Sequence, residues 1–168
     1  LQGVMRWRCT TKIHAFMASN NMTNIALHDT PLTKDMAAEL THANCPETLD
    51  QRTAMIKSGQ VSGYRKSAGF FSYAVQVVHV ECKNVARLFS RFMQNPGEKH
   101  CVAVIYALGY LLKNADDYME YRRPDGFDGS FHLLIMVDAD LGGDHSGGKN
   151  SSSTMAGVAF LENNHCYS

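Results

Sequence analysis

Residues 131–163 read FHLLIMVDADLGGDHSGGKNSSSTMAGVAFLEN, and this stretch decides the fold class. An apolar run from His132 to Val137 ends at Asp138, and a second apolar run covers Met155 to Leu161. Glycines and serines separate the two runs, so the pattern predicts two buried strands joined by a long hairpin loop. The first strand is expected to present Asp138 at its C-terminal end, where oxygen ligands could hold a divalent cation.

The rest of the chain predicts mainly helices. The segment 83–94 carries one apolar stripe, and 98–113 is almost entirely apolar, with Asn95-Pro96-Gly97 between them. A short helix is expected from Thr10 or Thr11, which can cap it, to Asn20-Asn21. Residues 24–32 are expected to be extended, and 33–60 to be a surface connection with one helical turn near 34–40.

Two further segments leave choices open. Residues 63–80 begin as a helix, but the β-branched end, 76–80, fits a strand equally well. Residues 118–122, with the sequence YMEYR, are predicted to form a short strand before the turn Pro124-Asp125-Gly126.

Composition excludes several classes of protein. The chain has 168 residues, 45% hydrophobic and 19% charged, which is typical of a globular domain. Lys plus Arg and Asp plus Glu number 16 each, and this balance argues against strong autonomous binding of nucleic acid. No apolar run approaches the ~20 residues of a membrane span. No signal peptide is recognised, and both ends of the chain look like cuts.

The five cysteines are widely spaced and include no C-x-x-C pair. This pattern predicts reduced thiols in the cytoplasm or nucleus rather than a disulfide framework or a zinc site.

The motifs resemble copia-type retrotransposon polyproteins over about residues 10–163. The start of that family's ribonuclease H domain has the pattern D-A-D-W-A-G-D, then a serine-rich turn and S-T-x-G. It resembles the segment MVDADLGGDHSGGKNSSSTMAGVAFLEN of this chain. GYRKSAGFFSYAV at 63–75 and SRFMQNPGEKH at 90–100 resemble the end of its reverse transcriptase, and 11–32 fits the preceding segment. The chain departs from the family at Leu141 and Cys101, where the family has tryptophan.

The resemblance implies an α+β chain: a helical connection segment followed by the first antiparallel strands of a ribonuclease H-like fold. Its expected parts are the end of a reverse transcriptase with a surface connection (1–62), the helical connection (63–114) and a partial ribonuclease H-like domain (115–168). The implied partners are an RNA–DNA hybrid and the remainder of the polyprotein, and no membrane is implied.

The resemblance also implies the site residues. Asp138 matches the first metal-binding aspartate of ribonuclease H, and Asp140 and Asp144 complete the same acidic motif. Mg²⁺ is the implied cofactor. Arg87, Arg91, Lys99 and Lys149 are candidate contacts to the nucleic-acid backbone.

The chain has neither a Y-x-D-D motif nor the family's S-T-E-A-E helix, so we expect a relic of a catalytic site without activity of its own. Val104, Ile105, Tyr106 and Gly109 stand where the family often has polar or basic residues, and they are interpreted as sequence drift after loss of selection. The alternative is a non-catalytic helical interaction or structural fragment, which packs against a polymerase or self-associates through 101–112.

Three other kinds of site are less favoured by the sequence. Residues 138–144 resemble a calcium loop, but Gly142 and Lys149 stand where the loop needs ligands. The segment GGDHSGGKNSSS lacks phosphate-loop spacing. Glu39, His42, Cys45 and Glu47 lie close in sequence without metal-ligand spacing, so a solvated loop is the favoured interpretation there.

Overall fold

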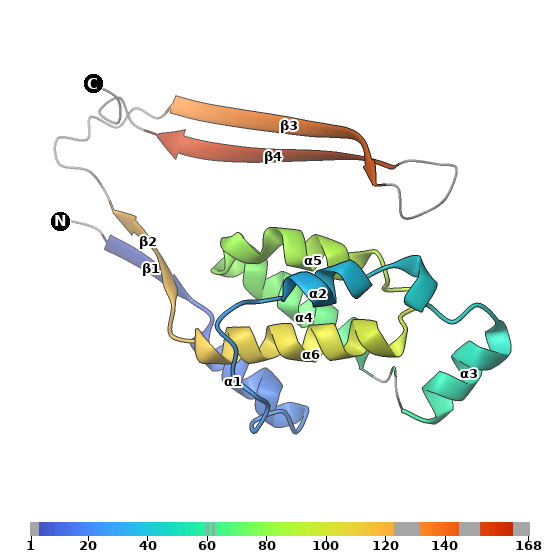
Figure 1. The fold of residues 1–168 in the computed structure, drawn as a ribbon. Coiled ribbons are helices and arrows are strands. Elements are labelled where there is room, and N and C mark those ends of the chain that lie inside the picture. The colour runs from blue at the N-terminus through green and yellow to red at the C-terminus, as the bar shows by residue number, and fades with distance from the viewer. Residues whose placement is uncertain (1–3, 60, 62, 123–131, 145–151, 163–168) are drawn as a thin grey trace. The chain divides into compact units, whose positions relative to one another are not determined.

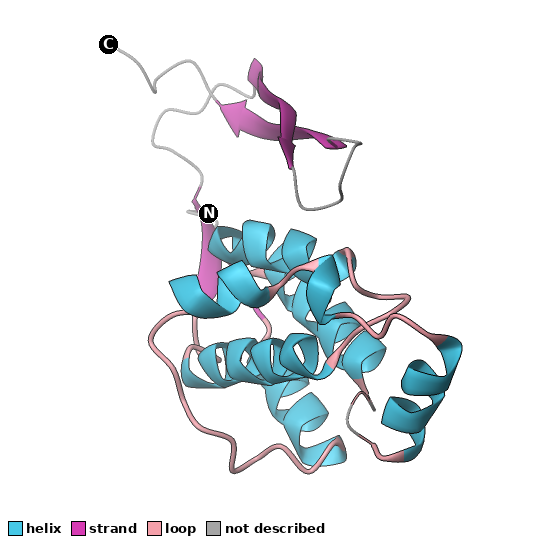
Figure 2. Cartoon of the chain, turned by 45° about the vertical axis from the view of Figure 1, so that its right-hand side comes forward, coloured by secondary structure: helices cyan, strands magenta, loops and turns pink. Residues whose placement is uncertain are grey.

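The computed structural model describes residues 4–59, 61, 63–122, 132–144 and 152–162, with side chains as far as Tyr121. It is a mixed fold, mostly helical, with two small two-stranded sheets (Figures 1 and 2). The chain divides into a helical unit, Arg6–Glu120, and a second unit that holds 121–168 with residues 1–5. In order the elements are β1 (Val4–Arg8), α1 (Thr10–Ser19), α2 (Lys34–Glu39), η1 (His42–Asn44), α3 (Leu49–Lys57), α4 (Tyr64–Val77), η2 (Val80–Cys82), α5 (Lys83–Ser90), α6 (Glu98–Lys113), β2 (Tyr118–Arg122), β3 (His132–Asp144) and β4 (Ser152–Glu162).

Helix α1 confirms the first predicted helix but not its cap. Ile13 and Met17 are fully buried, as the apolar spacing requires. The N-terminal cap is Cys9, which makes no side-chain capping bond. The hydroxyl of Thr10 instead donates to the backbone oxygen of Ala115 at 2.7 Å. Thr10 therefore does not cap α1, and its hydrogen bond joins α1 to the segment that follows α6.

The segment 33–60 is more helical than the sequence pattern predicted. The turn near 34–40 is confirmed as α2, capped by Thr33, whose Oγ1 accepts from Met36 N. A second helix, α3, was missed, although its start carries a capping box. Thr48 accepts from the backbone N–H of Gln51, and the Gln51 side chain accepts from that of Thr48.

Helices α4 and α5 resolve the open choices in the middle of the chain. The helix from Tyr64 continues to Val77, so the strand alternative for 76–80 is wrong, and η2 follows it. Helix α5 ends at Ser90 rather than at residue 94. Phe92 lies past that end and is still buried, because the following turn returns it to the core.

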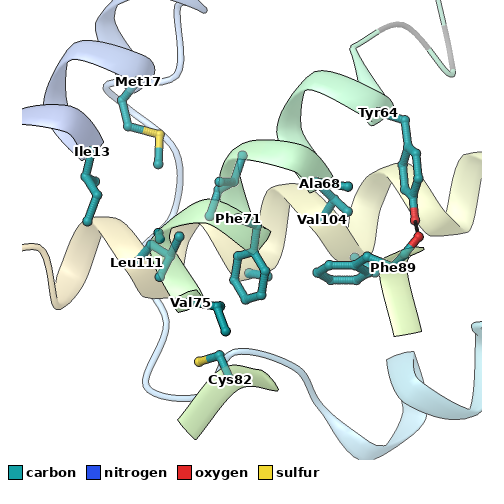
Figure 3. Close-up of a cluster of buried hydrophobic side chains, with 14 of the residues drawn as sticks. Ile13, Met17, Tyr64, Ala68, Phe71, Val75, Cys82, Phe89, Val104 and Leu111 are labelled. Carbon is teal, nitrogen blue, oxygen red and sulfur yellow. Dashed lines mark hydrogen bonds between the residues drawn. The ribbon is translucent and has the colours of Figure 1, made fainter. Parts of the chain in front are cut away.

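Helix α6 spans the predicted 98–113 and is the centre of the helical unit. It packs against α4, α2, α1 and η1, and its inward residues are buried. Figure 3 shows the shared core, in which the phenol of Tyr64 donates to the backbone oxygen of Phe89 at 2.8 Å. The rings of Phe71 and Phe89 meet edge to face, 5.4 Å apart. An almost wholly apolar helix is thus explained by burial on several sides.

Tyr106 and Gly109 of α6, which the sequence pattern suggested were drift, have packing roles, and so does the neighbouring Tyr110. Tyr106 stacks on His28, with ring centres 3.6 Å apart. The hydroxyl of Tyr110 donates to Glu81 at 3.2 Å. A Cβ at Gly109 would overlap the carbonyl oxygen of Ala26, so only glycine lets the 24–32 segment approach the helix so closely. Loss of selection is not needed to account for these positions.

The strands confirm the hairpin and add one element. Strand β3 pairs antiparallel with β4, with Leu134 opposite Phe160 and Val137 opposite Gly157. The predicted strand at 118–122 is β2, and its neighbour is β1, which the sequence analysis did not predict. Arg6 on β1 donates to the Glu120 carboxylate of β2 at 2.7 Å. This hydrogen bond raises the pKa of Arg6 above its usual value.

Candidate functional site

The acidic residues Asp138, Asp140 and Asp144 all lie within β3. Asp138 was expected at the end of the first strand, and this expectation is wrong, because the ladder continues past it. Asp138 is paired with Ala156 and Asp140 with Thr154, and the register shifts between Asp140 and Asp144, which is opposite Ser152. The strand ends at the third aspartate, and the irregularity separates it from the first two.

The backbone of β3 determines how the three aspartates are placed relative to one another. Positions 138 and 140 are two residues apart, so strand alternation puts them on the same face of the β3–β4 ladder. Carboxylate oxygens are the hard ligands that Mg²⁺ prefers, and the donor set therefore suits this cation. Because the register shifts between Asp140 and Asp144, the alternation that relates Asp138 to Asp140 does not extend to Asp144.

The described candidate nucleic-acid contacts lie on helices α5 and α6 or directly after α5. Arg87 is exposed on α5, and Arg91 follows its end, with its guanidinium 5.7 Å from the centre of the Phe92 ring. Lys99 lies in the first turn of α6, where its Nζ is 2.6 Å from Glu39 Oε1. Both partners are about half exposed, so the pair contributes little to stability and can exchange with another anion. Lys149 lies outside the described residues.

Two of the four residues considered as a metal cluster near α2, Glu39 and His42, have other contacts. Glu39 is engaged by Lys99, and the ring of His42 tilts over Phe92 at 5.3 Å. Among the side chains that the structure describes, no group of three His, Cys, Asp or Glu residues is placed to hold a metal ion. The described thiols, Cys9, Cys45, Cys82 and Cys101, are all unpaired.

A polar centre around Glu81 was missed by the sequence analysis. Glu81 Oε1 lies 3.2 Å from His79 Nδ1 and accepts from the Tyr110 hydroxyl at 3.2 Å. The thiol of Cys82 also points to this oxygen, at 3.6 Å. Burial, with the negative charge of Glu81, raises the pKa of Cys82 to about 12. The only signal in the sequence was the short spacing of His79 and Glu81, since Tyr110 joins them from a distant helix.

A second buried histidine lies between the helices. His100 on α6 is fully buried and stacks on Phe92, with ring centres 4.1 Å apart. Its Nδ1 accepts from the backbone N–H of Gly97 at 2.8 Å, so it caps its own helix. Burial lowers the pKa of this imidazole, which keeps the ring neutral and able to accept that bond.

Comparison with known proteins gives one informative similarity. The chain is 30% identical over 132 residues to the Retrovirus-related Pol polyprotein from transposon TNT 1-94 of Nicotiana tabacum. The match covers 79% of this chain, whereas the chain spans only 9% of the length of that relative. No family model and no solved structure matches the chain. The similarity supports the interpretation of the chain as a fragment of a retrotransposon polyprotein. In the described part of the chain, no helix combines the length and the apolar character that crossing a bilayer requires.

Proposed function

We propose that this chain is the end of the reverse transcriptase and the start of the ribonuclease H domain of a copia-type retrotransposon polyprotein, without activity on its own. The order of elements carries the proposal. A helical unit that contains the 63–75 and 90–100 motifs precedes an antiparallel pair whose first strand holds Asp138. The similarity to a transposon polyprotein covers most of the same chain and supports this assignment.

In this proposal Asp138 is the relic of the first metal-binding aspartate. Together with Asp140 and Asp144, it would hold Mg²⁺ through carboxylate oxygens. Mg²⁺, when bound, supplies Lewis-acid stabilisation of charge and an activated water. Hydrolysis by a pair of cations needs them about 4 Å apart, and further carboxylates must bridge and flank them. One acidic motif on one strand is too small a donor set for this, so we expect weak Mg²⁺ binding and no cleavage.

The helical unit would contribute to holding the RNA–DNA hybrid. Arg87, Arg91 and Lys99 would meet phosphates through charge, and Lys149, which lies outside the described residues, is proposed to do the same. Because acidic and basic residues balance, we expect binding to be weak and strongly dependent on salt.

A hybrid-cleavage assay tests the proposal. The purified 168-residue chain is incubated with a labelled RNA–DNA hybrid and Mg²⁺ or Mn²⁺, beside Asp138→Asn and a control, Asp50→Asn, on the exposed side of α3. We expect no cleavage by any of the three, and weak Mg²⁺ binding that Asp138→Asn alone removes. Cleavage that depends on Asp138 would overturn the claim of inactivity. Mg²⁺ binding that both variants retain would remove the role assigned to Asp138.

A non-catalytic interaction fragment is the second candidate, and helix α3 favours it. No residue of α3 is buried, and Leu49 and Ile56 are 75% and 57% exposed. A capped helix with no buried face is stabilised poorly unless something else covers it. Self-association through 101–112 stays a prediction. Most apolar side chains of that segment are buried within the helical unit, and Val102 and Ile105 are its exposed ones.

A further inference from the structure

A polar pocket of about 320 Å³ opens on the helical unit, apart from every residue assigned above to metal or nucleic acid. Its walls come from the turn after α4, from η2, from the outer face of α6 and from the start of β2. The volume is at the small end of ligand pockets and suits one side-chain head group or a small amine. The residues that line it are Val78, His79, Glu81, Tyr110, Asp117 and Tyr118.

The polar groups of this pocket are hydrogen-bond acceptors. His79 is 1% exposed, and its Nδ1 faces Glu81 Oε1, so Nδ1 carries the proton that forms this bond. In the neutral ring, Nε2 then holds a lone pair, and Nε2 is buried without a hydrogen-bond partner. The hydroxyl of Tyr110 donates to Glu81, which leaves its oxygen able to accept. A ligand rich in N–H donors would satisfy these atoms.

The charge of the pocket favours the same kind of ligand. Two carboxylates, Glu81 and Asp117, line it, and no lysine or arginine is among its described lining residues. Burial first, and then Cys82, Glu81 and Asp117, raise the pKa of Tyr110 to about 12, as expected where the local field is negative.

One aromatic wall already receives cations. The guanidinium carbons of Arg6 and Arg8 lie 4.9 and 5.3 Å from the centre of the Tyr118 ring. Arg6 is also paired with Glu120, so its charge is compensated locally. Aromatic faces attract guanidinium and ammonium groups through the ring quadrupole.

We propose that this pocket binds a guanidinium or primary ammonium group, held by Glu81 and Asp117, with His79 Nε2 as an additional acceptor. The site would take the end of an arginine or lysine side chain from another polypeptide, or a free alkylamine. It does not rest on the role in nucleic-acid processing proposed above, because it needs neither Asp138 nor a bound hybrid.

Titration of the full chain by NMR, followed at the His79 imidazole and the Tyr110 ring, tests the proposal. The probes are N-acetyl-arginine amide, n-butylamine and N-acetyl-citrulline amide, which copies the shape of arginine without its charge. We expect saturable shifts with the arginine probe, with butylamine or with both, and none with citrulline. The stronger of the two cationic probes identifies the preferred head group. Equal binding of citrulline, or no saturable shift with either cation, would overturn the proposal.

Two variants sharpen the test. Glu81→Gln and Asp117→Asn should each weaken binding about twofold to fivefold, as expected for one partly exposed charge pair. Asp50→Asn, on α3, should leave binding unchanged. Glu81 also accepts bonds from His79 and Tyr110, so Glu81→Gln could impair folding, whereas Asp117 is exposed and its replacement should not. Unchanged affinity in the folded Asp117→Asn protein would contradict the proposed role of the negative charge.

Discussion

Replacing Gly109 by alanine gives the sharpest test of how the 24–32 segment packs on α6. A Cβ at this position would overlap the carbonyl oxygen of Ala26 and lie 2.9 Å from His28 Cδ2. The overlapped atom is backbone, and the segment is held there by the stack of His28 on Tyr106 and by the ion pair of Asp29 with Lys113. It cannot move aside without loss of these contacts.

The magnitude follows from two opposing effects. Overpacking of this kind costs up to about 3 kcal/mol. Replacing glycine by alanine inside a helix stabilises the folded state by about 1 kcal/mol through helix propensity. We therefore expect Gly109→Ala to lower the free energy of unfolding by about 2 kcal/mol. At about 4 °C per kcal/mol, the midpoint of thermal unfolding should fall by roughly 8 °C.

Gly69 provides the matched control. It lies within α4, and a Cβ there would meet no atom within 4 Å. Gly69→Ala should therefore raise the free energy of unfolding by up to about 1 kcal/mol. The two variants are compared by urea unfolding monitored through far-ultraviolet circular dichroism. If Gly109→Ala is as stable as Gly69→Ala, the close approach of Ala26 to α6 is wrong, and drift again becomes the better account of Gly109.

Three further outcomes are expected. Tyr64→Phe should cost about 1 kcal/mol in urea unfolding, because the buried oxygen of Phe89 loses the phenol donor and keeps the backbone N–H of Phe92; an unchanged midpoint would show that the bond adds nothing. The pKa of His100 is lowered below its unfolded value of 6.5, so the unfolded chain binds more protons below that pH. The stability contributed by neutral His100 should be complete above pH 6.5 and fall as the pH drops toward the folded pKa. In His100→Gln, the free energy of unfolding should depend less on pH over this range. Identical pH profiles of unfolding for the two proteins would refute the assignment. Leu49→Lys and Ile56→Lys should change stability by less than about 0.5 kcal/mol but reduce any concentration-dependent association seen by sedimentation, and association that survives both changes would exclude α3 as the contact.

The sequence by itself determined the elements whose pattern is long and regular. The apolar runs on either side of the glycine- and serine-rich stretch predicted β3 and β4, and the stripes around Ile13 and Phe89 predicted α1 and α5. Helix α6 was predicted to its terminal residues, because Gly97 and the end of the apolar run mark both boundaries. These predictions succeed because periodicity records which face of an element is removed from water.

Only the tertiary structure decided which distant residues meet. The bond from Thr10 to Ala115, the close approach of Ala26 to Gly109 and the meeting of Tyr110 with Glu81 join segments far apart in the chain. No local pattern encodes such pairs, since each depends on how helices pack rather than on where they begin. The same reason explains why Asp138 could be located by motif, whereas the acceptor-lined pocket at His79 came only from the folded chain: a motif is contiguous, and a pocket is assembled by packing.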